Sequence, residues 1–358
     1  MTKRLITLAV TWLAALAALA QAGIPAYAQA AQYEGAANKA LAWIKTQQQP
    51  DGSFAGFGAG STLDAVLAIV AANLDPNTYV QGGNNPITFL ESKAGALATT
   101  PGGAGKLLIV AHAIGRSGVS FGGVDLGSTI NASYGISATG QYGPDGIGHA
   151  FSILGLSAAG QPVPPAAVDR LLGLQVAGGG WAFSGDTSAG SADTNTTAVA
   201  LQALVAVGAD KTNGDAIKRA VSYITAQQNS DGGWPYQQGS EFGSDSDVNS
   251  TSYVVQAMLA LKNTTLAEAG QRFIASLQKP GGAFPYSQAV PDDSPGATYQ
   301  AIPALLGATL VSPRSEAGAT VQPGMPVTGA GHEWAYLAAL VAFAMLLSGT
   351  GVALRRTR

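Results

Sequence analysis

The chain has 358 residues, of which 47% are hydrophobic and only 11% charged, which is enough apolar material for a large buried core. It contains no cysteine, which excludes disulfides, thiolate nucleophiles and thiolate metal sites. The formal net charge is −3 and the body of the chain carries no basic cluster, so we exclude a nucleic-acid partner.

Residues 1–30 have the three parts of a secretory signal peptide. Two basic residues lie near the start, an apolar stretch runs from Leu5 to Ala20, and small residues within 26–30 offer a peptidase site. The alternative is an uncleaved membrane anchor, but the apolar stretch is short for a membrane span. The sequence therefore predicts export and cleavage.

The body of the chain, residues 31–310, contains repeats that share one sequence pattern. An aromatic residue or leucine precedes a Gln by four or five positions. A Gly lies four residues after the Gln, and an aromatic residue lies two residues after the Gly. Internal repetition of this kind predicts a stack of similar structural units. The Gln and aromatic positions of the four copies are Gln48 and Phe54, Gln175 and Trp181, Gln228 and Trp234, and Gln278 and Phe284.

Each repeat is predicted to contain two helices, an amphipathic one and, after a Gly-rich turn, one rich in Ala and Leu. Almost every position of residues 197–205 is apolar or small, as expected for a helix buried on all sides. Short oxygen-bearing side chains at the starts of the second helices are expected to cap them. These starts are predicted near Ser61, Ala104, Ile147, Asn195, Asn249 and Gly296.

The Gln-to-aromatic sequence pattern resembles the QW motif of the prenyltransferase and squalene cyclase (terpenoid cyclase) repeat superfamily. The resemblance covers residues 31–310 and implies an all-α fold, an (α/α)6 toroid with six inner helices ringed by six outer ones. In that superfamily the motif is structural, because the Gln side chain ties the outer helix to the turn and the aromatic ring stacks beneath it. The Gln and aromatic residues given above are therefore expected to support the fold rather than catalysis.

The residues argue against the enzyme chemistries of that superfamily. Its zinc-dependent prenyltransferases need a cysteine ligand, so no metal or cofactor is expected. Its class II cyclases protonate an alkene with the central Asp of an Asp-X-Asp-Asp stretch, but Asn195 and Asn249 occupy that position after Asp193 and Asp247. An amide cannot donate that proton. The remaining candidate acids are Asp193, Asp247 and Asp293, the last from the chain's only adjacent acid pair.

The leading hypothesis is therefore a non-catalytic module that binds an apolar small molecule or a surface protein through the lumen of the ring. The candidate ligand-binding residues are His149, Asn195, Asn249, Tyr236 and Tyr286. Two alternatives stay open: an isoprenoid or terpene cyclase-like enzyme with a non-standard acid, and a structural cell-surface protein without a ligand.

Residues 311–329 contain three prolines and many small residues, and they are predicted to form a flexible stalk. The stalk ends in Met-Pro-Val-Thr-Gly, which resembles the sortase sorting signal with Met in place of Leu. The resemblance implies cleavage between Thr328 and Gly329, with sortase as a partner. The alternative is a pentapeptide match without sorting.

Residues 330–358 have the pattern of a membrane anchor. The stretch from Trp334 to Leu354 has no charge and is long enough to cross a bilayer as a helix. Three arginines follow it, which predicts a cytoplasmic tail and an external body. We expect the protein at the extracellular face of the cell membrane or in the cell wall.

Overall fold

The computed structural model describes residues 26–135, 139–241 and 243–314. These residues contain twelve α-helices, three short 3-10 helices and no β-strand, so the prediction of an all-α protein is confirmed. All of them belong to the first of two compact units, Met1–Ala319, and the second unit lies outside the described residues. Within the described residues no helix combines the length and apolar character that a membrane span requires.

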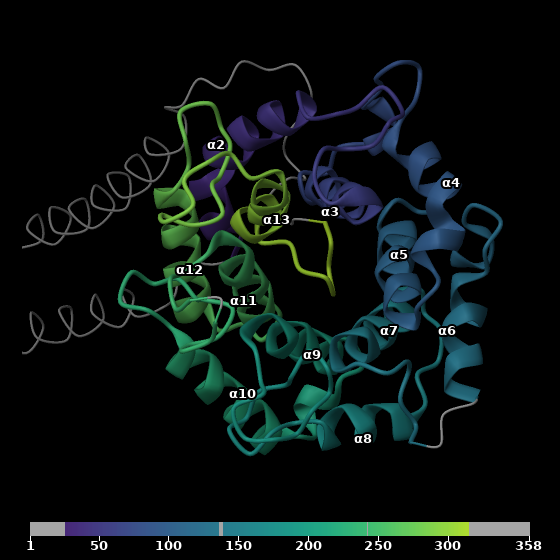
Figure 1. Cartoon of the computed structure of the whole chain (residues 1–358), viewed down its shortest axis with the longest axis vertical. Helices are drawn as coiled ribbons and strands as arrows, with labels where there is room; N and C mark the ends of the chain where they lie inside the picture. The colour runs from purple at the N-terminus through teal and green to yellow at the C-terminus, as the bar shows by residue number, and fades with distance from the viewer. Residues whose placement is uncertain (1–25, 136–138, 242, 315–358) are drawn as a thin grey trace, which may run out of the picture. The chain divides into compact units, whose positions relative to one another are not determined.

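Six helices form the outside of the unit (Figure 1). They alternate along the chain with the six inner helices, as the two-helix repeat predicts. In α10 and α12 the few buried residues lie on one side, which is typical of helices that cover a core. The outer helices are α2 (Ala26–Lys45), α4 (Pro86–Leu97), α6 (Leu126–Gly135), α8 (Pro165–Gly173), α10 (Gly214–Gln227) and α12 (Thr264–Ser276).

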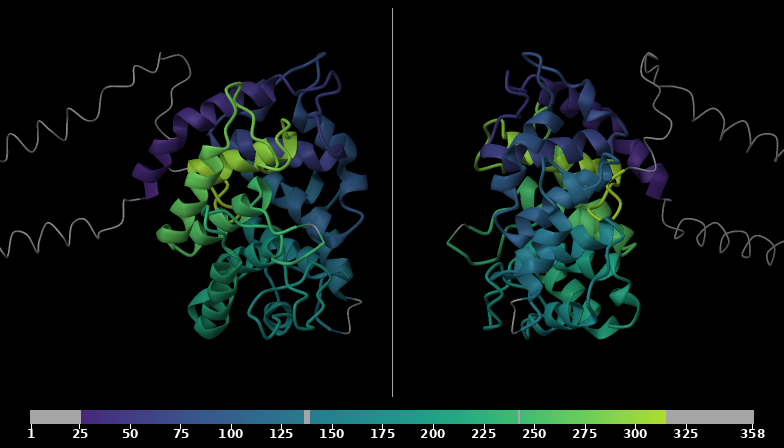
Figure 2. Two further views of the ribbon diagram at one scale, coloured as in Figure 1. Left: turned by 60° about the vertical axis from the view of Figure 1, so that its left-hand side comes forward. Right: turned by 90° about the vertical axis from the view of Figure 1, so that its right-hand side faces the viewer.

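The other six helices form an inner ring. Each contacts the next in chain order, and α13 contacts α3, so the ring closes. The purple start of the described chain and its yellow-green end accordingly lie side by side (Figures 1 and 2). This arrangement is consistent with an α/α toroid. The inner helices are α3 (Gly58–Ala71), α5 (Pro101–Ala113), α7 (Gly146–Ala158), α9 (Thr194–Ala206), α11 (Val248–Ala260) and α13 (Pro295–Leu306).

All inner helices except α3 start where a polar side chain accepts a hydrogen bond from the first turn. The carboxylate of Asp193 accepts from the Thr196 backbone N–H at 2.7 Å, and that of Asp247 accepts from Ser250 N–H at 2.6 Å. Asp145 caps α7 in the same way. These contacts satisfy backbone donors that have no partner inside the helix.

Glycine allows two inner helices to approach closely. A Cβ atom added to Gly105 of α5 would clash with the carbonyl oxygen of Phe151 in α7, and one added to Gly155 would lie 2.5 Å from the Gly105 oxygen. The backbones of α5 and α7 therefore touch where other residues would hold them apart. The short side chains of these helices let the ring close with a narrow interior.

The repeated Gln and aromatic residues join neighbouring elements. Trp181 and Trp234 are fully buried, and each indole N–H donates to a backbone carbonyl of its own outer helix, Leu171 or Ile224, at 2.7 Å. Gln278 donates to the carbonyl of Ala36 in α2 at 2.7 Å, which fastens the last repeat to the first. The other motif residues lie at equivalent turns, where Gln48, Gln175 and Gln228 donate to backbone carbonyls and Phe54 and Phe284 are buried.

The predicted terminal segments are only partly described. Helix α2 begins at Ala26, inside the segment predicted as a signal peptide, and the description continues past residue 310 to Arg314. Val311 packs against the core and Pro313 lines an internal cavity, so the start of the predicted stalk contacts the ring. Residues 1–25, the sorting motif with Thr328 and Gly329, and the predicted membrane helix lie outside the described residues.

Candidate functional site

The inner helices share a register that fixes which side chains enter the lumen. The hydroxyls of Thr62, Thr197, Thr251 and Thr298 each accept a hydrogen bond from the backbone N–H of the motif aromatic in their own repeat, at 2.9 to 3.0 Å. Each threonine thus holds its inner helix at one height against the Gly-rich turn. Residues at equal distances from these threonines lie at one level of the ring.

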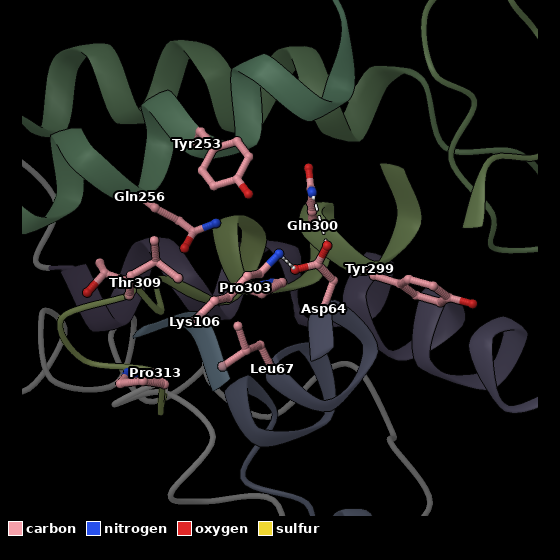
Figure 3. A pocket seen from close by; sticks show the side chains of 11 residues that line it. Asp64, Leu67, Lys106, Tyr253, Gln256, Tyr299, Gln300, Pro303, Thr309 and Pro313 are labelled. Atoms are coloured by element: carbon pink, nitrogen blue, oxygen red, sulfur yellow. Dashed lines mark hydrogen bonds and ion pairs between the residues drawn. The ribbon is translucent and has the colours of Figure 1, made fainter. Parts of the chain in front are cut away.

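The first level, two residues after the threonine position, contains a polar cluster. Asp64 comes from α3, Lys106 from α5, Tyr253 from α11 and Gln300 from α13, and all four line one cavity. Lys106 Nζ lies 2.7 Å from Asp64 Oδ1, and Gln300 Nε2 lies 3.3 Å from Asp64 Oδ2 (Figure 3). We call these four residues the lumen cluster.

Charge and burial have opposite effects on the pKa of Lys106 in the lumen cluster. The Lys106 and Asp64 side chains are only 19% and 16% exposed. Burial would lower the pKa of the Lys106 ammonium, but the charge and hydrogen bond of Asp64, together with Tyr253, raise it on balance, so Lys106 stays charged. Burial also raises the pKa of Tyr253, which keeps its hydroxyl protonated. The ammonium also lies 5.9 Å from the centre of the Phe151 ring in α7.

The second level lies one helical turn further along the same faces. It contains Leu67, Gln202, Gln256 and Pro303, three of which line the same cavity. Tyr253 and Gln256 point their polar ends toward Lys106 and Asp64 in Figure 3. The cavity has a volume of about 20 Å³. That is room for about one water molecule, so the space between these residues is nearly filled.

The lumen cluster combines groups of different chemistry at one level of the ring. Asp64 contacts the Lys106 ammonium through Oδ1 and the Gln300 amide through Oδ2. Lys106, Tyr253 and Gln300 supply a cation, a hydroxyl and an amide. Gln300 Oε1 is buried and has no hydrogen-bond partner among the described residues. Such a set of converging polar groups in an apolar ring is typical of a site that orients a polar part of a ligand.

The predicted acids lie elsewhere. Asp193 and Asp247 cap α9 and α11, and their side chains also interact with Tyr236 and Tyr286 of the following repeat. Burial raises the pKa of Asp193 and raises that of Asp247 to about 6. Neither carboxylate lines the lumen cavity. Tyr236 and Tyr286 thus join neighbouring repeats through these aspartates.

Asp293 is on the surface. Its side chain is 45% exposed and forms an ion pair with Lys279 at 2.6 Å. An exposed ion pair of this kind contributes little to stability. The structure therefore does not bring Asp293 together with Asp193 or Asp247 into a shared acid site.

The remaining candidates are one core residue and two residues in the first turns of inner helices. His149 is fully buried, accepts the Tyr142 backbone N–H on Nδ1 at 3.0 Å and donates from Nε2 to Ala167 O at 2.9 Å. Asn195 and Asn249 are half-buried, and each Oδ1 lacks a hydrogen-bond partner among the described residues. Asn249 lies one turn before Tyr253 on the same face of α11, so it is next to the lumen cluster in register.

Asp64 and Lys106 were not predicted from the sequence, although it contains a signal for them. They are the only Asp, Glu, Lys or Arg residues in the six inner helices. A charge of each sign inside otherwise apolar helices would have identified both. Among the described residues no three acidic or histidine side chains gather in a way that could hold a metal ion.

Comparisons with known proteins agree with this architecture. Residues 3–76 match the model of the prenyltransferase alpha-alpha toroid domain, and residues 189–290 match that of the squalene-hopene cyclase C-terminal domain. The first match overlaps the segment predicted as a signal peptide. No curated protein matches the chain in sequence.

Several solved structures share the fold. A variant of the type II terpene cyclase MstE from Scytonema, in complex with geranylgeranyl dihydroxybenzoate, has a TM-score of 0.52 and 14% identity, with 78% of this chain and 97% of that chain covered. A protein from Actinoplanes has a TM-score of 0.55 and 15% identity, covering 76% and 98%. A glycosidase variant has a TM-score of 0.51 and 13% identity, covering 77% and 96%.

At these identities the solved structures establish the fold and leave the chemistry open. The two family models match separate parts of the chain, one in the first repeat and one across the fourth to sixth. The resemblance of the repeats to the prenyltransferase and squalene cyclase superfamily is thereby confirmed.

Proposed function

We propose that this is an exported, surface-anchored toroid protein that binds a ligand in its lumen without converting it. The lumen cluster is the observation that carries the proposal. Two buried charges cost desolvation energy that their mutual attraction rarely exceeds, so an ion pair is weak evidence for a stabilising role. A toroid that needed only stability could fill this level with apolar side chains, as Val199 does in α9.

The chemistry of the cluster favours a ligand with both polar and apolar parts. Lys106, Tyr253 and Gln300 offer donors at one level, and Leu67 and Pro303 form apolar walls beside them. The ligand expected from the sequence was apolar. The polar lining supports an amphiphilic small molecule whose polar end reaches the lumen cluster.

The absence of conversion is supported by the placement of the acids. The Asp-X-Asp-Asp acid position is an asparagine in both matching repeats, and Asp193 and Asp247 accept backbone hydrogen bonds as helix caps. Asp64, the carboxylate in the lumen cluster, is held in an ion pair. None of these groups is placed to deliver a proton into the lumen.

The direct test is extraction of the full-length protein from cells that make it, followed by mass spectrometry of co-purifying small molecules. The proposal predicts a stoichiometric small molecule that is absent from an Asp64→Leu/Lys106→Met double variant. A wild-type protein that carries no small molecule would support the structural alternative, a surface protein without a ligand. Mass spectrometry of the mature ends tests export and sorting, and a C-terminus intact through Arg358 contradicts sorting at Thr328.

An enzymatic function is the second candidate, and one observation favours it. Burial raises the pKa of Asp247 to about 6, which brings that group close to the range of a general acid. Incubation with squalene and with prenyl diphosphates, followed by product analysis, tests this candidate. Cyclic products that disappear in Asp247→Asn or Asp193→Asn would replace the binding proposal.

A further inference from the structure

The segment that follows the last inner helix fills the lumen. Gly307 ends α13 in the left-handed conformation, with φ of 76°, and turns the chain back. Figure 1 shows the segment reaching from α13 into the middle of the inner ring. Ala308, Thr309 and Leu310 are at most 8% exposed, and Thr309 and Pro313 border the cavity in Figure 3. We call residues Ala308 to Arg314 the plug.

The plug contacts helices far from it in the sequence. The Leu310 backbone N–H donates to Gln202 Oε1 of α9 at 2.8 Å. The Arg314 guanidinium donates to the carbonyl of Ala113, the last residue of α5, at 3.1 Å. The Leu310 side chain packs in the main hydrophobic core. The plug is therefore bound as a short peptide would be, through one main-chain group, one apolar side chain and one cation.

The fit of the plug is incomplete. Gln202 is fully buried, yet its Nε2 has no hydrogen-bond partner among the described residues, and neither does Gln300 Oε1. An optimised structural element leaves few such atoms, because an unpaired buried polar group destabilises the folded state. These two atoms are hydrogen-bonding groups beside the lumen that the plug leaves unused.

We propose that the plug is a displaceable internal ligand that keeps the lumen closed until it withdraws. This proposal rests on the proposed function of the lumen as a ligand site. It explains how a cavity of about 20 Å³ belongs to a binding protein, since withdrawal of Leu310 and Pro313 enlarges it. Residues 311–314 of the plug belong to the segment predicted as a stalk.

Single cysteines test whether the plug opens while the ring stays folded, because the chain has none of its own. In the full-length protein, Leu310→Cys is compared with Phe57→Cys, which is 98% exposed, and Leu108→Cys, which is fully buried in the core. We expect a maleimide to label position 310 at least tenfold more slowly than 57 and at least tenfold faster than 108. Labelling at the rate of either control overturns the proposal, since the plug would then be permanently open or part of the core.

A peptide competition tests whether the plug is a ligand. A fluorescent peptide with the sequence of residues 307–314 is titrated into the full-length wild type, a Leu310→Asp variant and a Val80→Asp control, position 80 being 55% exposed. We expect at least tenfold tighter binding to Leu310→Asp, because the tethered plug competes at high effective concentration in the other two. A peptide carrying Asp at the Leu310 position should not bind.

The plug proposal is overturned if the peptide does not bind to a Leu310→Asp variant that still melts cooperatively. If that variant does not fold, the labelling rates of the cysteine variants decide alone. Failure of the proposed function has a different signature, namely no co-purifying small molecule from the wild type. The two failures are therefore distinguishable.

Discussion

Lys106 Nζ lies 2.7 Å from Asp64 Oδ1 and joins the second inner helix of the ring to the first. The pair is nearly enclosed, receives one further hydrogen bond from Gln300, and faces a cavity that the end of the described chain covers. The proposed binding function follows from this pair, and the predictions below separate it from the residues that support the fold.

Trp234→Ala should destabilise the ring without changing any residue that lines the lumen cavity. The indole is fully buried and its N–H donates to Ile224 O, so truncation leaves a cavity and an unpaired carbonyl. We expect a loss of about 3–5 kcal/mol in the free energy of unfolding and a lower melting temperature. Phe57→Ala, at a position 98% exposed, is the matched control and should stay within about 0.5 kcal/mol. An unchanged melting curve for Trp234→Ala contradicts its structural role.

Gly105→Ala and Gly95→Ala should have opposite effects. A methyl group at Gly105 meets the backbone of Phe151, which cannot move aside without shifting α7, and we expect a loss of about 1–3 kcal/mol. Gly95 lies in the outer helix α4 with open space around it, so alanine there should stabilise the protein by about 0.5–1 kcal/mol. Urea unfolding measures both, and equal effects would argue against close packing of α5 on α7.

His149 should make stability depend on pH. Burial lowers its pKa to about 4 from 6.5 in the unfolded chain, so the unfolded state binds more protons between these values. Its contribution is fully present above pH 6.5 and is lost as the pH falls toward 4, by roughly 3 kcal/mol. Asp247 acts in the opposite sense, because its raised pKa gives stability that is lost as the pH rises through about 6.

The His149 prediction is measured as the difference in unfolding free energy between the wild type and His149→Gln at several pH values. Both proteins contain Asp247, so its contribution cancels. Below pH 6.5 the wild type should lose stability relative to His149→Gln. A difference that is constant from pH 7 to pH 4 would mean that the imidazole is not held neutral.

The sequence predicted the helices and their order well, because local features determine them. Repeated Gln and aromatic residues mark each turn, and Asp193 and Asp247 mark the starts of buried helices within one residue. These signals are contained within single repeats. The same locality explains why the two aspartates were treated as candidate acids, since their partners Tyr236 and Tyr286 belong to the next repeat.

The site was harder to predict because it is assembled from distant repeats. Asp64, Tyr253 and Gln300 meet only after the ring closes between α13 and α3. The plug was not predicted either, because the prolines and small residues from 311 onward favoured a flexible stalk. Leu310 and Val311 were the contrary signal, because two adjacent apolar residues at a domain end are often buried.

The most direct measurement is the unfolding free energy of Asp64→Leu/Lys106→Met beside the two single variants. If the pair is retained for binding, the double variant should be within about 1 kcal/mol of the wild type or more stable, while each single variant loses about 3–5 kcal/mol by leaving one charge unpaired. A double variant that loses as much as the single variants would contradict the account, because the ion pair would then belong to the fold rather than to a ligand site.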